Sequence, residues 1–352
     1  MGSRNMNQVS AIIFGASGYS GEELVRRLSL HPGVRITAIT SRQAAGKRAA
    51  DVFPWLNPKQ FVAQLRFQEP VLSRLPLSES TVAFLALPHG VAHEFAGPLL
   101  DAGVRVLDLS ADFRLKDART YAQFYGHEHP QPELLARSVY GLPEIHREKI
   151  KRAQLVACPG CFPTSILLPV LPLVKHGLIR PESVIATSLS GVSGAGRKIE
   201  QSYLFVECNE SARAYGLPLH RHLSEIEQEI SAFAGRPVTI QFSPHLIPLN
   251  RGIVSTIYGD PIGAPSESDI EAVLQQFYSE DAFIRLLGSQ RFPDVKNVAF
   301  TNAAEIAWRV DPRTGKIILL SSLDNLLKGA AGQAIQCLNI MEGWDEGSAL
   351  IA

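Results

Sequence analysis

The fold is decided near the start of the chain by the stretch Val9-Ser10-Ala11-Ile12-Ile13-Phe14-Gly15-Ala16-Ser17-Gly18-Tyr19-Ser20-Gly21. An apolar run over 9–14 predicts a strand, and the pattern G-x-x-G-x-x-G leads from it into a predicted helix at Gly21–Leu30. Glycines let the backbone approach a pyrophosphate, and a helix N-terminus offers N–H donors to phosphate oxygens. A tight turn without a ligand has the same glycines, but the position in the first strand-to-helix turn favours a dinucleotide site. Its candidate residues are Gly15, Ser17, Gly18, Tyr19, Ser20 and Gly21.

Strand and helix patterns continue to alternate through the first half, with strands predicted at 34–40, 82–86 and 104–109 and a helix at 90–102. Alternation of this kind is typical of a doubly wound, Rossmann-type parallel sheet in an α/β protein. In the second half, strands are predicted at 184–189, 238–242, 253–259, 298–310 and 317–322, with helices at 224–234 and 266–278. This pattern predicts a second α+β domain with a mixed or antiparallel sheet. The change of pattern places the boundary near Val156.

Composition narrows the classes of partner. Among 352 residues, Lys plus Arg and Asp plus Glu both number 34, so the net charge favours neither nucleic acid nor an acidic membrane and fits a small-molecule substrate. The apolar run Ser165–Val174 is shorter than the roughly 20 residues that span a bilayer. The polar start, Met1–Asn5, lacks an apolar signal core, and four cysteines make no disulfide scaffold. We therefore expect a cytoplasmic protein.

The end of the second strand normally distinguishes the two nicotinamide cofactors, because an acidic residue there binds the ribose 2′-OH and repels a 2′-phosphate. Here the sequence is Thr40-Ser41-Arg42, without a carboxylate. Ser41 and Arg42 could hold a phosphate, so NADP(H) is favoured over NAD, although Arg42 could equally be a solvated surface residue. A later strand ends in Ala86-Leu87-Pro88-His89-Gly90, and Pro88 is a further candidate for the cofactor site, or part of a simple turn.

A possible nucleophile lies in Cys158-Pro159-Gly160-Cys161-Phe162-Pro163-Thr164, which precedes an apolar segment. Pro163 is tolerated in a first helical turn, so we expect Cys161 at a helix N-terminus, where N–H groups and the helix dipole favour a thiolate. A buried structural cysteine, a redox pair and half of a zinc site are the alternatives. Zinc is disfavoured because Cys208 and Cys337 stand alone, and we predict no metal site.

Cysteine chemistry needs a proton donor and acceptor, and His220-Arg221-His222 is the densest histidine cluster. Because alternate residues of a helix cannot face the same way, at most one of the two histidines should meet the sulfur. Exposed polar residues at a helix start are the alternative for this cluster. The remaining histidines near motifs are expected to be structural or solvated: His89, His93, His127, His129 and His245.

Two further features suit an anion. The glycine-rich stretch 190–198, which includes Ser190, Gly194 and Arg197, offers N–H groups, hydroxyls and a basic end to an oxyanion such as phosphate, or forms a flexible connection. Arg114, in Ala111-Asp112-Phe113-Arg114, is a candidate clamp for carboxylate or phosphate, or pairs with Asp112 on the surface.

Taken together, these motifs resemble the N-acetyl-gamma-glutamyl-phosphate reductases, the arginine-pathway family of the semialdehyde dehydrogenase superfamily. The resemblance runs nearly end to end and also includes Tyr140-Gly141-Leu142-Pro143-Glu144 and Asp324-Asn325-Leu326-Leu327-Lys328-Gly329. It implies an NADPH-dependent reduction of N-acetyl-L-glutamyl 5-phosphate to N-acetyl-L-glutamate 5-semialdehyde and phosphate, through a cysteine thioester, in arginine biosynthesis. Aspartate-semialdehyde dehydrogenase and an enzyme acting on a carrier-bound aminoadipyl phosphate are the nearest alternatives; a nicotinamide-binding redox sensor is a more distant one.

Three residue roles are implied by the matching motifs, and the other assignments are our own expectations. The resemblance implies that Cys161 is the nucleophile, that His220 is the acid/base, and that Asn325 contacts the nicotinamide. Gly194 is assigned to the cofactor, and Arg114, Ser190 and Arg197 are assigned to the substrate. Residues 1–157 and 325–352, with a final helix at Asn325–Met341, are expected to form the NADP-binding domain. Residues 158–324 are expected to form the catalytic and dimerisation domain of a homodimer or homotetramer.

Two positions depart from the family pattern. Cys158 stands where related enzymes usually have valine or asparagine, and Phe162 where tyrosine is common. The spacing of Cys158 and Cys161 suggests the hypothesis that oxidation joins them in a disulfide and silences the enzyme.

Overall fold

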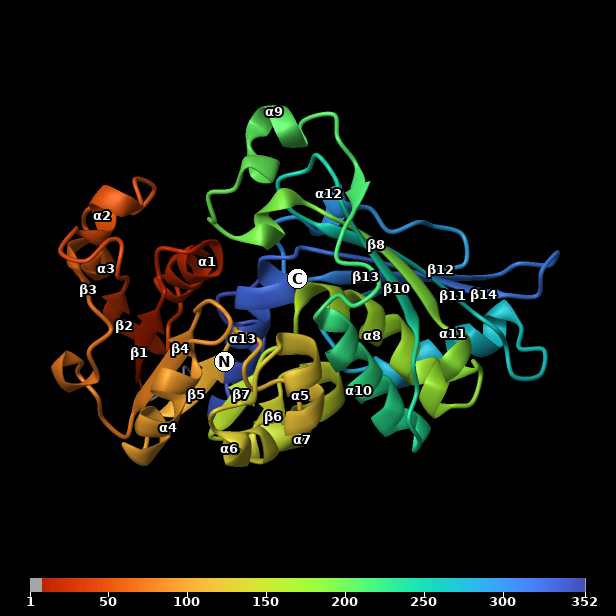
Figure 1. Cartoon of the computed structure of the whole chain (residues 1–352), viewed down its shortest axis with the longest axis horizontal. Helices are drawn as coiled ribbons and strands as arrows, with labels where there is room; N and C mark the ends of the chain where they lie inside the picture. The colour runs from red at the N-terminus through yellow and green to blue at the C-terminus, as the bar shows by residue number, and fades with distance from the viewer. Residues whose placement is uncertain (1–7, 352) are drawn as a thin grey trace, which may run out of the picture. The chain divides into compact units, whose positions relative to one another are not determined.

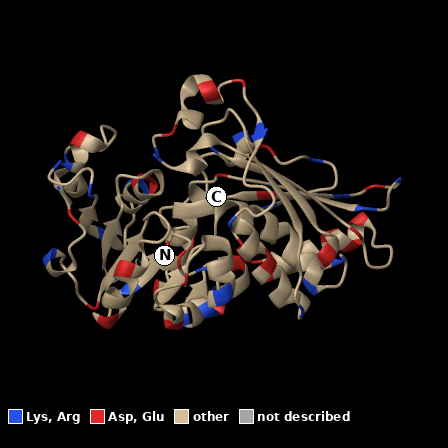
Figure 2. Ribbon diagram, viewed as in Figure 1, with Lys and Arg blue, Asp and Glu red and all other residues tan. Residues whose placement is uncertain are grey.

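The structure is a computed structural model that describes residues 8–351, so the polar start at 1–5 lies outside the described residues. The chain divides into two compact units. Unit 1 consists of Met1–Ala118, His129–Pro159 and Ala330–Leu350, and unit 2 of Arg119–Glu128, Gly160–Gly329 and Ile351–Ala352. Within residues 8–351, no helix combines the length and the apolar character needed to cross a membrane. Figure 2 shows basic and acidic residues interspersed along both units, in keeping with the balanced charge.

Unit 1 is built on a seven-stranded sheet whose strand order is β3-β2-β1-β4-β5-β7-β6 (Figure 1). All of its strand pairs are parallel, as the alternating pattern predicted. The strands are β1 (Val9–Phe14), β2 (Val34–Thr40), β3 (Phe67–Gln68), β4 (Thr81–Leu85), β5 (Arg105–Asp108), β6 (Val139–Tyr140) and β7 (Leu155–Ala157). The helices are α1 (Tyr19–Leu28), α2 (Ala49–Val52), α3 (Phe61–Gln64), a 3-10 turn (Leu72–Arg74), α4 (His93–Asp101), α6 (Pro132–Arg137), α7 (Pro143–Ile150) and α13 (Gly332–Glu342).

Helices cover both faces of this sheet. On one face, Leu24 of α1 and Ile335 of α13 belong to the same buried cluster as Ile13. On the other, Phe95 of α4 and Leu135 of α6 pack in a second buried cluster. The last helix therefore completes the core of unit 1, although it follows the long segment Gly160–Gly329 of unit 2 in the sequence.

Unit 2 contains a mixed seven-stranded sheet in the order β12-β13-β14-β11-β8-β10-β9. The pairs β8/β10 and β12/β13 are parallel, and the other pairs are antiparallel, as predicted for a mixed sheet. The strands are β8 (Ile185–Ser190), β9 (Arg213–Ala214), β10 (Gln241–Leu246), β11 (Ile253–Gly259), β12 (Ile284–Gly288), β13 (Ala304–Val310) and β14 (Ile317–Leu323). The helices are α5 (Ala118–Tyr125), α8 (Cys161–Lys175), α9 (Phe205–Cys208), α10 (His222–Ala234), α11 (Glu267–Phe277) and α12 (Val295–Val298), with 3-10 turns at Pro181–Ser183, Val192–Ala195 and Gln201–Tyr203.

Several predicted boundaries were wrong. The predicted strand at 298–310 begins only at Ala304, because the short helix α12 precedes it. The predicted strand at 238–242 lies at Gln241–Leu246 instead. The predicted final helix is interrupted, because a π-helical turn at Leu327–Ala331 comes before α13. Such turns are rare and occur often at functional sites.

Helix α8 is buried along almost its whole length and contains two internal prolines, Pro169 and Pro172. Each proline lacks the N–H that would bond to the carbonyl four residues earlier. Two side chains replace those donors: Ser321 Oγ donates to the Ser165 carbonyl, and Tyr278 Oη donates to the Leu168 carbonyl. The sequence can therefore carry prolines inside this helix without leaving buried carbonyls unpaired.

Candidate active site

Cys161 is the first residue of α8, and Gly160 is its N-cap with extended backbone. The predicted position of the thiol at a helix N-terminus is confirmed. The side chain is half-buried, so it combines partial solvent access with the N–H groups of the first turn. These are the surroundings that favour a reactive thiolate over an inert buried cysteine.

A buried carboxylate holds the turn that leads into α8. Glu225, in the first turn of α10, is only 1 % exposed, and its Oε2 accepts a hydrogen bond from the Gly160 N–H at 3.1 Å. Its Oε1 lies 4.0 Å from His222 Nε2. The glutamate was not selected from the sequence, where it is one of several acidic residues on an amphipathic helix.

The two histidines of the His-Arg-His motif lie together. Their ring centroids are 4.9 Å apart, and both rings contact the ring of Phe162, the neighbour of Cys161. The prediction that at most one of them faces the sulfur assumed that both lie on one helix, whereas α10 begins at His222 and His220 precedes it. His222 is therefore a second candidate, which the sequence analysis named in the motif without giving it a role.

His220 lies in apolar surroundings formed by Phe162, Phe242 and Tyr215. Burial, and then the positive charge of Arg221, lowers the pKa of His220 from 6.5 to about 4. Its Nδ1 accepts a hydrogen bond from the His222 N–H at 3.2 Å, which orients the ring. At neutral pH the imidazole is therefore uncharged, as a proton acceptor must be.

Gly329, in the π-helical turn, packs directly against the cysteine. A Cβ at position 329 would lie 2.7 Å from Cys161 Cβ and 3.1 Å from its Cα. Only glycine permits this approach. Gly329 is therefore the residue of this turn that most clearly indicates its contact with Cys161.

The glycine-rich loop after β8 meets the segment that follows β14. Asn325 Oδ1 accepts from the Gly252 N–H at 2.6 Å, and its Nδ2 donates to Ser193 Oγ at 3.0 Å. A Cβ at Gly194 would lie 3.4 Å from Ser190 Oγ and 3.7 Å from Asn325 Nδ2. The structure therefore brings Ser190, Gly194 and Asn325 together, whereas Arg197 lies at the exposed end of the loop.

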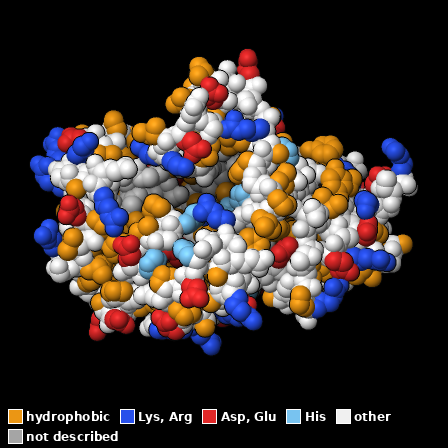
Figure 3. All heavy atoms as spheres, viewed as in Figure 1, with side chains coloured by type: hydrophobic (Ala, Val, Ile, Leu, Met, Phe, Trp, Pro, Cys, Tyr) orange, Lys and Arg blue, Asp and Glu red, His pale blue; other side chains and the backbone are white. Residues whose placement is uncertain are grey.

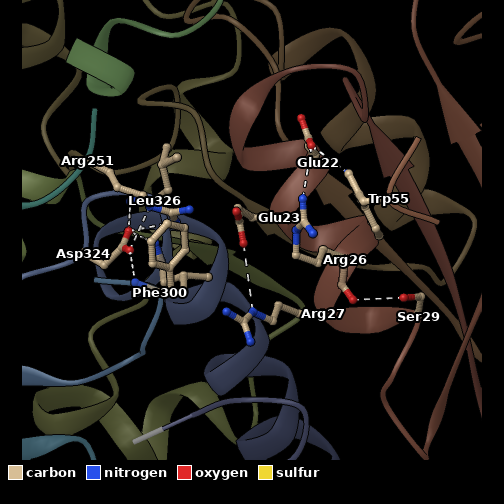
Figure 4. Close-up of polar contacts among 11 residues, drawn as sticks. Glu22, Glu23, Arg26, Arg27, Ser29, Trp55, Arg251, Phe300, Asp324 and Leu326 are labelled. Carbon is tan, nitrogen blue, oxygen red and sulfur yellow. Dashed lines mark hydrogen bonds and ion pairs between the residues drawn. The ribbon is translucent and has the colours of Figure 1, made fainter. Parts of the chain in front are cut away.

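Asp324 anchors the same segment. Its buried carboxylate pairs with Arg251, at 2.9 Å from Nε and 3.0 Å from Nη2, and accepts from the N–H groups of Phe300 and Leu326 (Figure 4). The Asn325 amide therefore extends from a fixed backbone.

In unit 1, the predicted cofactor loop has the geometry that a dinucleotide requires. Gly15 has φ +70°, and a Cβ there would lie 2.2 Å from the Ala86 carbonyl oxygen. Gly18, the N-cap of α1, has no side chain to cover the helix N-terminus, which leaves space for a phosphate at its N–H groups. The loop of Ala86 to Pro88 lies against Gly15, so the two predicted cofactor segments meet.

The end of β2 lies beside this loop. Ser17 Oγ and Ser41 Oγ are 2.8 Å apart, and Arg42 is exposed with Nη2 3.4 Å from Glu94 Oε2. Tyr19 and Ser20 form the first turn of α1. These residues fit a phosphorylated ribose at the end of β2, because hydroxyl and guanidinium donors are available and no acidic residue occupies positions 40–42.

Arg114 donates hydrogen bonds to backbone carbonyls, a contact that the sequence analysis did not anticipate. It is buried in unit 1, where its Nε donates to the Cys158 carbonyl at 2.8 Å and its Nη2 donates to the Leu109 carbonyl at 3.0 Å. The guanidinium joins the ends of β5 and β7 instead of presenting itself at the surface. Nearby, burial and the charge of Asp112 raise the pKa of Asp108 to about 7.

Cys158 is buried, and its N–H donates to the Asp108 carbonyl at 2.7 Å. None of the cysteines within residues 8–351 forms a disulfide. Within the described range 8–351, no group of three or more His, Cys, Asp or Glu side chains is arranged to hold a metal ion.

Comparisons with known proteins identify the class. Residues 10–153 match the family model described as semialdehyde dehydrogenase, NAD binding domain, and residues 161–325 match semialdehyde dehydrogenase, dimerisation domain. Among solved structures, aspartate semialdehyde dehydrogenase II from Vibrio cholerae has a TM-score of 0.72 at 18% identity, over 95% of this chain and 98% of that one. The enzyme from Candida albicans, solved with NADP, has a TM-score of 0.69 at 18% identity, over 95% and 98%. These likenesses show the same fold.

Closer relatives are found by sequence. N-acetyl-gamma-glutamyl-phosphate reductase from Akkermansia muciniphila is 51% identical over 97% of this chain and 98% of its own length. The protein of the same name from Geotalea daltonii is 49% identical over 95% of each chain. The chain belongs to the N-acetyl-gamma-glutamyl-phosphate reductase family of semialdehyde dehydrogenases. Its class is that of the NAD(P)-dependent oxidoreductases, as the sequence predicted.

Proposed function

We propose that the chain reduces N-acetyl-L-glutamyl 5-phosphate to N-acetyl-L-glutamate 5-semialdehyde and inorganic phosphate, with NADPH, as a step of arginine biosynthesis in the cytoplasm. The observation that carries the proposal is the half-buried Cys161 at the N-terminus of α8, with the His220–His222 pair packed on the adjacent Phe162. Relatives named for this reaction that are about half identical over nearly the full length support the choice of substrate.

The first step forms a thioester. The sulfur of Cys161 bonds to the acyl carbon, the bond from that carbon to the phosphate oxygen breaks, and the thiol proton passes through His220 to the departing phosphate. An uncharged His220 can accept that proton at neutral pH. The main-chain N–H groups of the first turn of α8 stabilise the thiolate and the oxyanion that forms beside it.

NADPH, when bound, supplies the hydride that reduces the thioester carbonyl. The tetrahedral oxyanion held on Cys161 then collapses to the aldehyde and regenerates the thiolate. Gly15, Ser17, Gly18, Tyr19, Ser20 and Gly21 would hold the pyrophosphate, and Ser41 and Arg42 would hold the 2′-phosphate. Pro88 is a further proposed cofactor residue of unit 1, and Gly194 and Asn325 are proposed cofactor residues of unit 2. Ser190, Arg197 and Arg114 are proposed to bind the substrate; two of the Arg114 donor atoms, Nε and Nη2, also bond to backbone carbonyls.

His222 is a second candidate for the proton-transfer residue. Its Nε2 lies beside Glu225, and a Cβ at Gly160 would come within 2.5 Å of it. Replacing each histidine by asparagine in turn separates the two: the variant that loses the pH dependence of the acylation rate identifies the acid/base. We expect it to be His220→Asn.

We further propose that the enzyme is a homodimer or a dimer of dimers that pairs through the open face of the sheet in unit 2. Helices α8, α10 and α11 lie on the other face. Ile185 and Leu189 of β8 and Tyr258 of β11 alternate outward and remain exposed. This region lies inside the match to the dimerisation domain model. Residues 1–157 with 325–352 would serve the cofactor, and residues 158–324 would serve catalysis and dimerisation.

The decisive assay is the reverse reaction: phosphate-dependent reduction of NADP by N-acetylglutamate semialdehyde. We expect turnover by the wild type and none by Cys161→Ser. Efficient turnover of aspartate semialdehyde, with none of the N-acetylated aldehyde, would refute the proposed substrate. Equal rates with and without phosphate would refute the acyl-phosphate chemistry.

A further inference from the structure

Unit 2 displays an apolar surface on the segment 199–219, which we name the arm. The arm consists of the 3-10 turn at Gln201–Tyr203, the one-turn helix α9 and the short strand β9. Ile199 is 95% exposed, and Phe205 and Val206 are each 78% exposed. Leu204, Leu217 and Leu219 are also exposed. Figure 1 shows α9 standing away from the sheet of unit 2, and apolar spheres lie on that projection in Figure 3.

Polar contacts, and not a core of its own, hold the arm together. Cys208 Sγ donates to the Ser202 carbonyl at 3.2 Å, and Arg213 Nη2 donates to the same carbonyl at 2.7 Å. Ser202 Oγ in turn donates to Glu200. The backbone is thereby folded while the large apolar side chains face outward. Contiguous exposed apolar side chains of this kind mark an interaction surface.

A second copy of this chain is the occupant that the surroundings favour. The arm lies within the residues that match the dimerisation domain model. It joins the sheet through β9, where Arg213 and Ala214 pair with β10, and β10 pairs with β8. The arm is therefore joined to the edge of the same sheet in which Ile185 and Leu189 of β8 are exposed.

The end of the arm contacts the candidate acid/base residue. The Tyr215 ring lies 5.5 Å from the His220 ring in an edge-on arrangement, and a Cβ at Gly216 would lie 2.9 Å from His220 Cδ2. Gly216 has φ +65°, a conformation that other residues rarely adopt. The position of the arm and the position of the His220 imidazole are therefore linked.

We propose that the arm docks on a second copy of the chain and that this docking holds Tyr215 against His220, so that full activity requires the paired enzyme. The inference rests on the proposed function where activity is measured, because kcat requires the proposed substrate. The measurement of self-association does not depend on the substrate.

The test compares the double variant Phe205→Ser/Val206→Ser with Phe61→Ser, a control at a 53% exposed phenylalanine in unit 1. Ile199→Ser provides a second, single-residue variant. Sedimentation velocity over a dilution series measures association, and kcat per protomer is measured at the same concentrations. The rate at which iodoacetamide alkylates Cys161 gives a readout that needs no substrate. Circular dichroism verifies that each variant is folded.

We expect the arm variants to raise the dissociation constant of the dimer by at least about tenfold, because each pair of copies loses the apolar side chains twice. Their kcat should fall on dilution and recover at high protein concentration, whereas Phe61→Ser should behave as the wild type. Unchanged association would overturn the docking. Dissociated variants that keep wild-type kcat and alkylation rate would overturn the coupling. If the wild type shows no turnover of the proposed substrate, the proposed function fails, and association and alkylation still decide this inference.

Discussion

The Gly160 N–H donates to the Glu225 carboxylate at 3.1 Å, and this bond ties the turn before Cys161 to the first turn of α10. Glu225 is buried, and the same carboxylate lies 4.0 Å from His222. The Cys161 motif and the His220–His222 motif are more than fifty residues apart in the sequence, and the Glu225 side chain contacts both. Glu225 therefore helps to position the nucleophile and the histidine pair relative to each other.

Glu225→Ala should destabilise the protein and Glu225→Gln should not. Alanine leaves the buried Gly160 N–H without an acceptor, at a cost of about 1–3 kcal/mol in the free energy of unfolding, whereas glutamine keeps a carbonyl oxygen. Both variants should lose turnover, because the negative charge beside His222 is gone. Urea unfolding and kcat measure the two effects, with the exposed Glu280→Gln as control. Wild-type kcat in Glu225→Gln would argue against any role for the charge.

Gly329→Ala should reduce kcat by at least about tenfold through displacement of the thiol. The added methyl group would lie 2.7 Å from Cys161 Cβ, so either the turn or the cysteine must move, and overpacking of this kind typically costs about 1–3 kcal/mol. The alkylation rate of Cys161 should change with kcat. Gly347→Ala, which meets only an Asp345 carboxylate oxygen at 3.2 Å, is the matched control. Retention of both rates in Gly329→Ala would contradict the prediction.

Tyr278→Phe should lower the free energy of unfolding by about 1–3 kcal/mol, because the Leu168 carbonyl opposite Pro172 loses its donor. Ser321→Ala should act in the same way at the Ser165 carbonyl opposite Pro169. Chemical denaturation measures both, with Ser279→Ala at an exposed position as the comparison. A loss no larger than that of Ser279→Ala would show that water satisfies these carbonyls instead.

His220 should make stability depend on pH on the acid side. Its pKa is about 4 in the folded chain and 6.5 ordinarily, so between these values the unfolded chain binds more protons. The His220 contribution is fully present above pH 6.5 and is lost as the pH falls toward 4. Unfolding measured across this range should show a shallower slope for His220→Gln than for the wild type. An NMR titration of His220 with a midpoint above 6 would contradict the prediction.

Arg42→Ala should raise the KM for NADP by roughly tenfold or more and leave kinetics with NAD nearly unchanged. The guanidinium is exposed at the end of β2, and its removal takes away a charged donor, worth about 1.5–3 kcal/mol, for a 2′-phosphate that only NADP carries. Steady-state kinetics with each cofactor measure the ratio. Arg35→Ala, also on β2, controls for loss of surface charge. Equal loss with both cofactors would point to a structural role for Arg42.

Local patterns in the sequence predicted the parallel and the mixed sheet and, together with the family resemblance, the class of enzyme. The alternation of β-branched runs and helical patterns predicted the parallel sheet, and Pro163 together with the apolar segment predicted that α8 begins at Cys161. Glycines at 15, 18 and 21 predicted a tight strand-to-helix turn, because the backbone geometry that they permit is a local property. Boundaries at 298–310 and 325–341 could not be predicted, since a one-turn helix and a π-helical turn have no periodicity to detect.

Tertiary structure decided which polar side chains belong to the site. His222 lies beside His220 because α10 begins at His222, two residues before the predicted start, and His220 precedes the helix. Glu225 reaches Gly160 only through the packing of α10 on α8. Arg114 donates to the carbonyls of Leu109 and Cys158, which follow two strands that are distant in the sequence. Periodicity and turn preferences depend on residues that are close in the sequence, so they can be predicted from it. The partner of a buried polar group is instead the donor or acceptor that the fold brings within about 3 Å, and that can be known only from the tertiary structure.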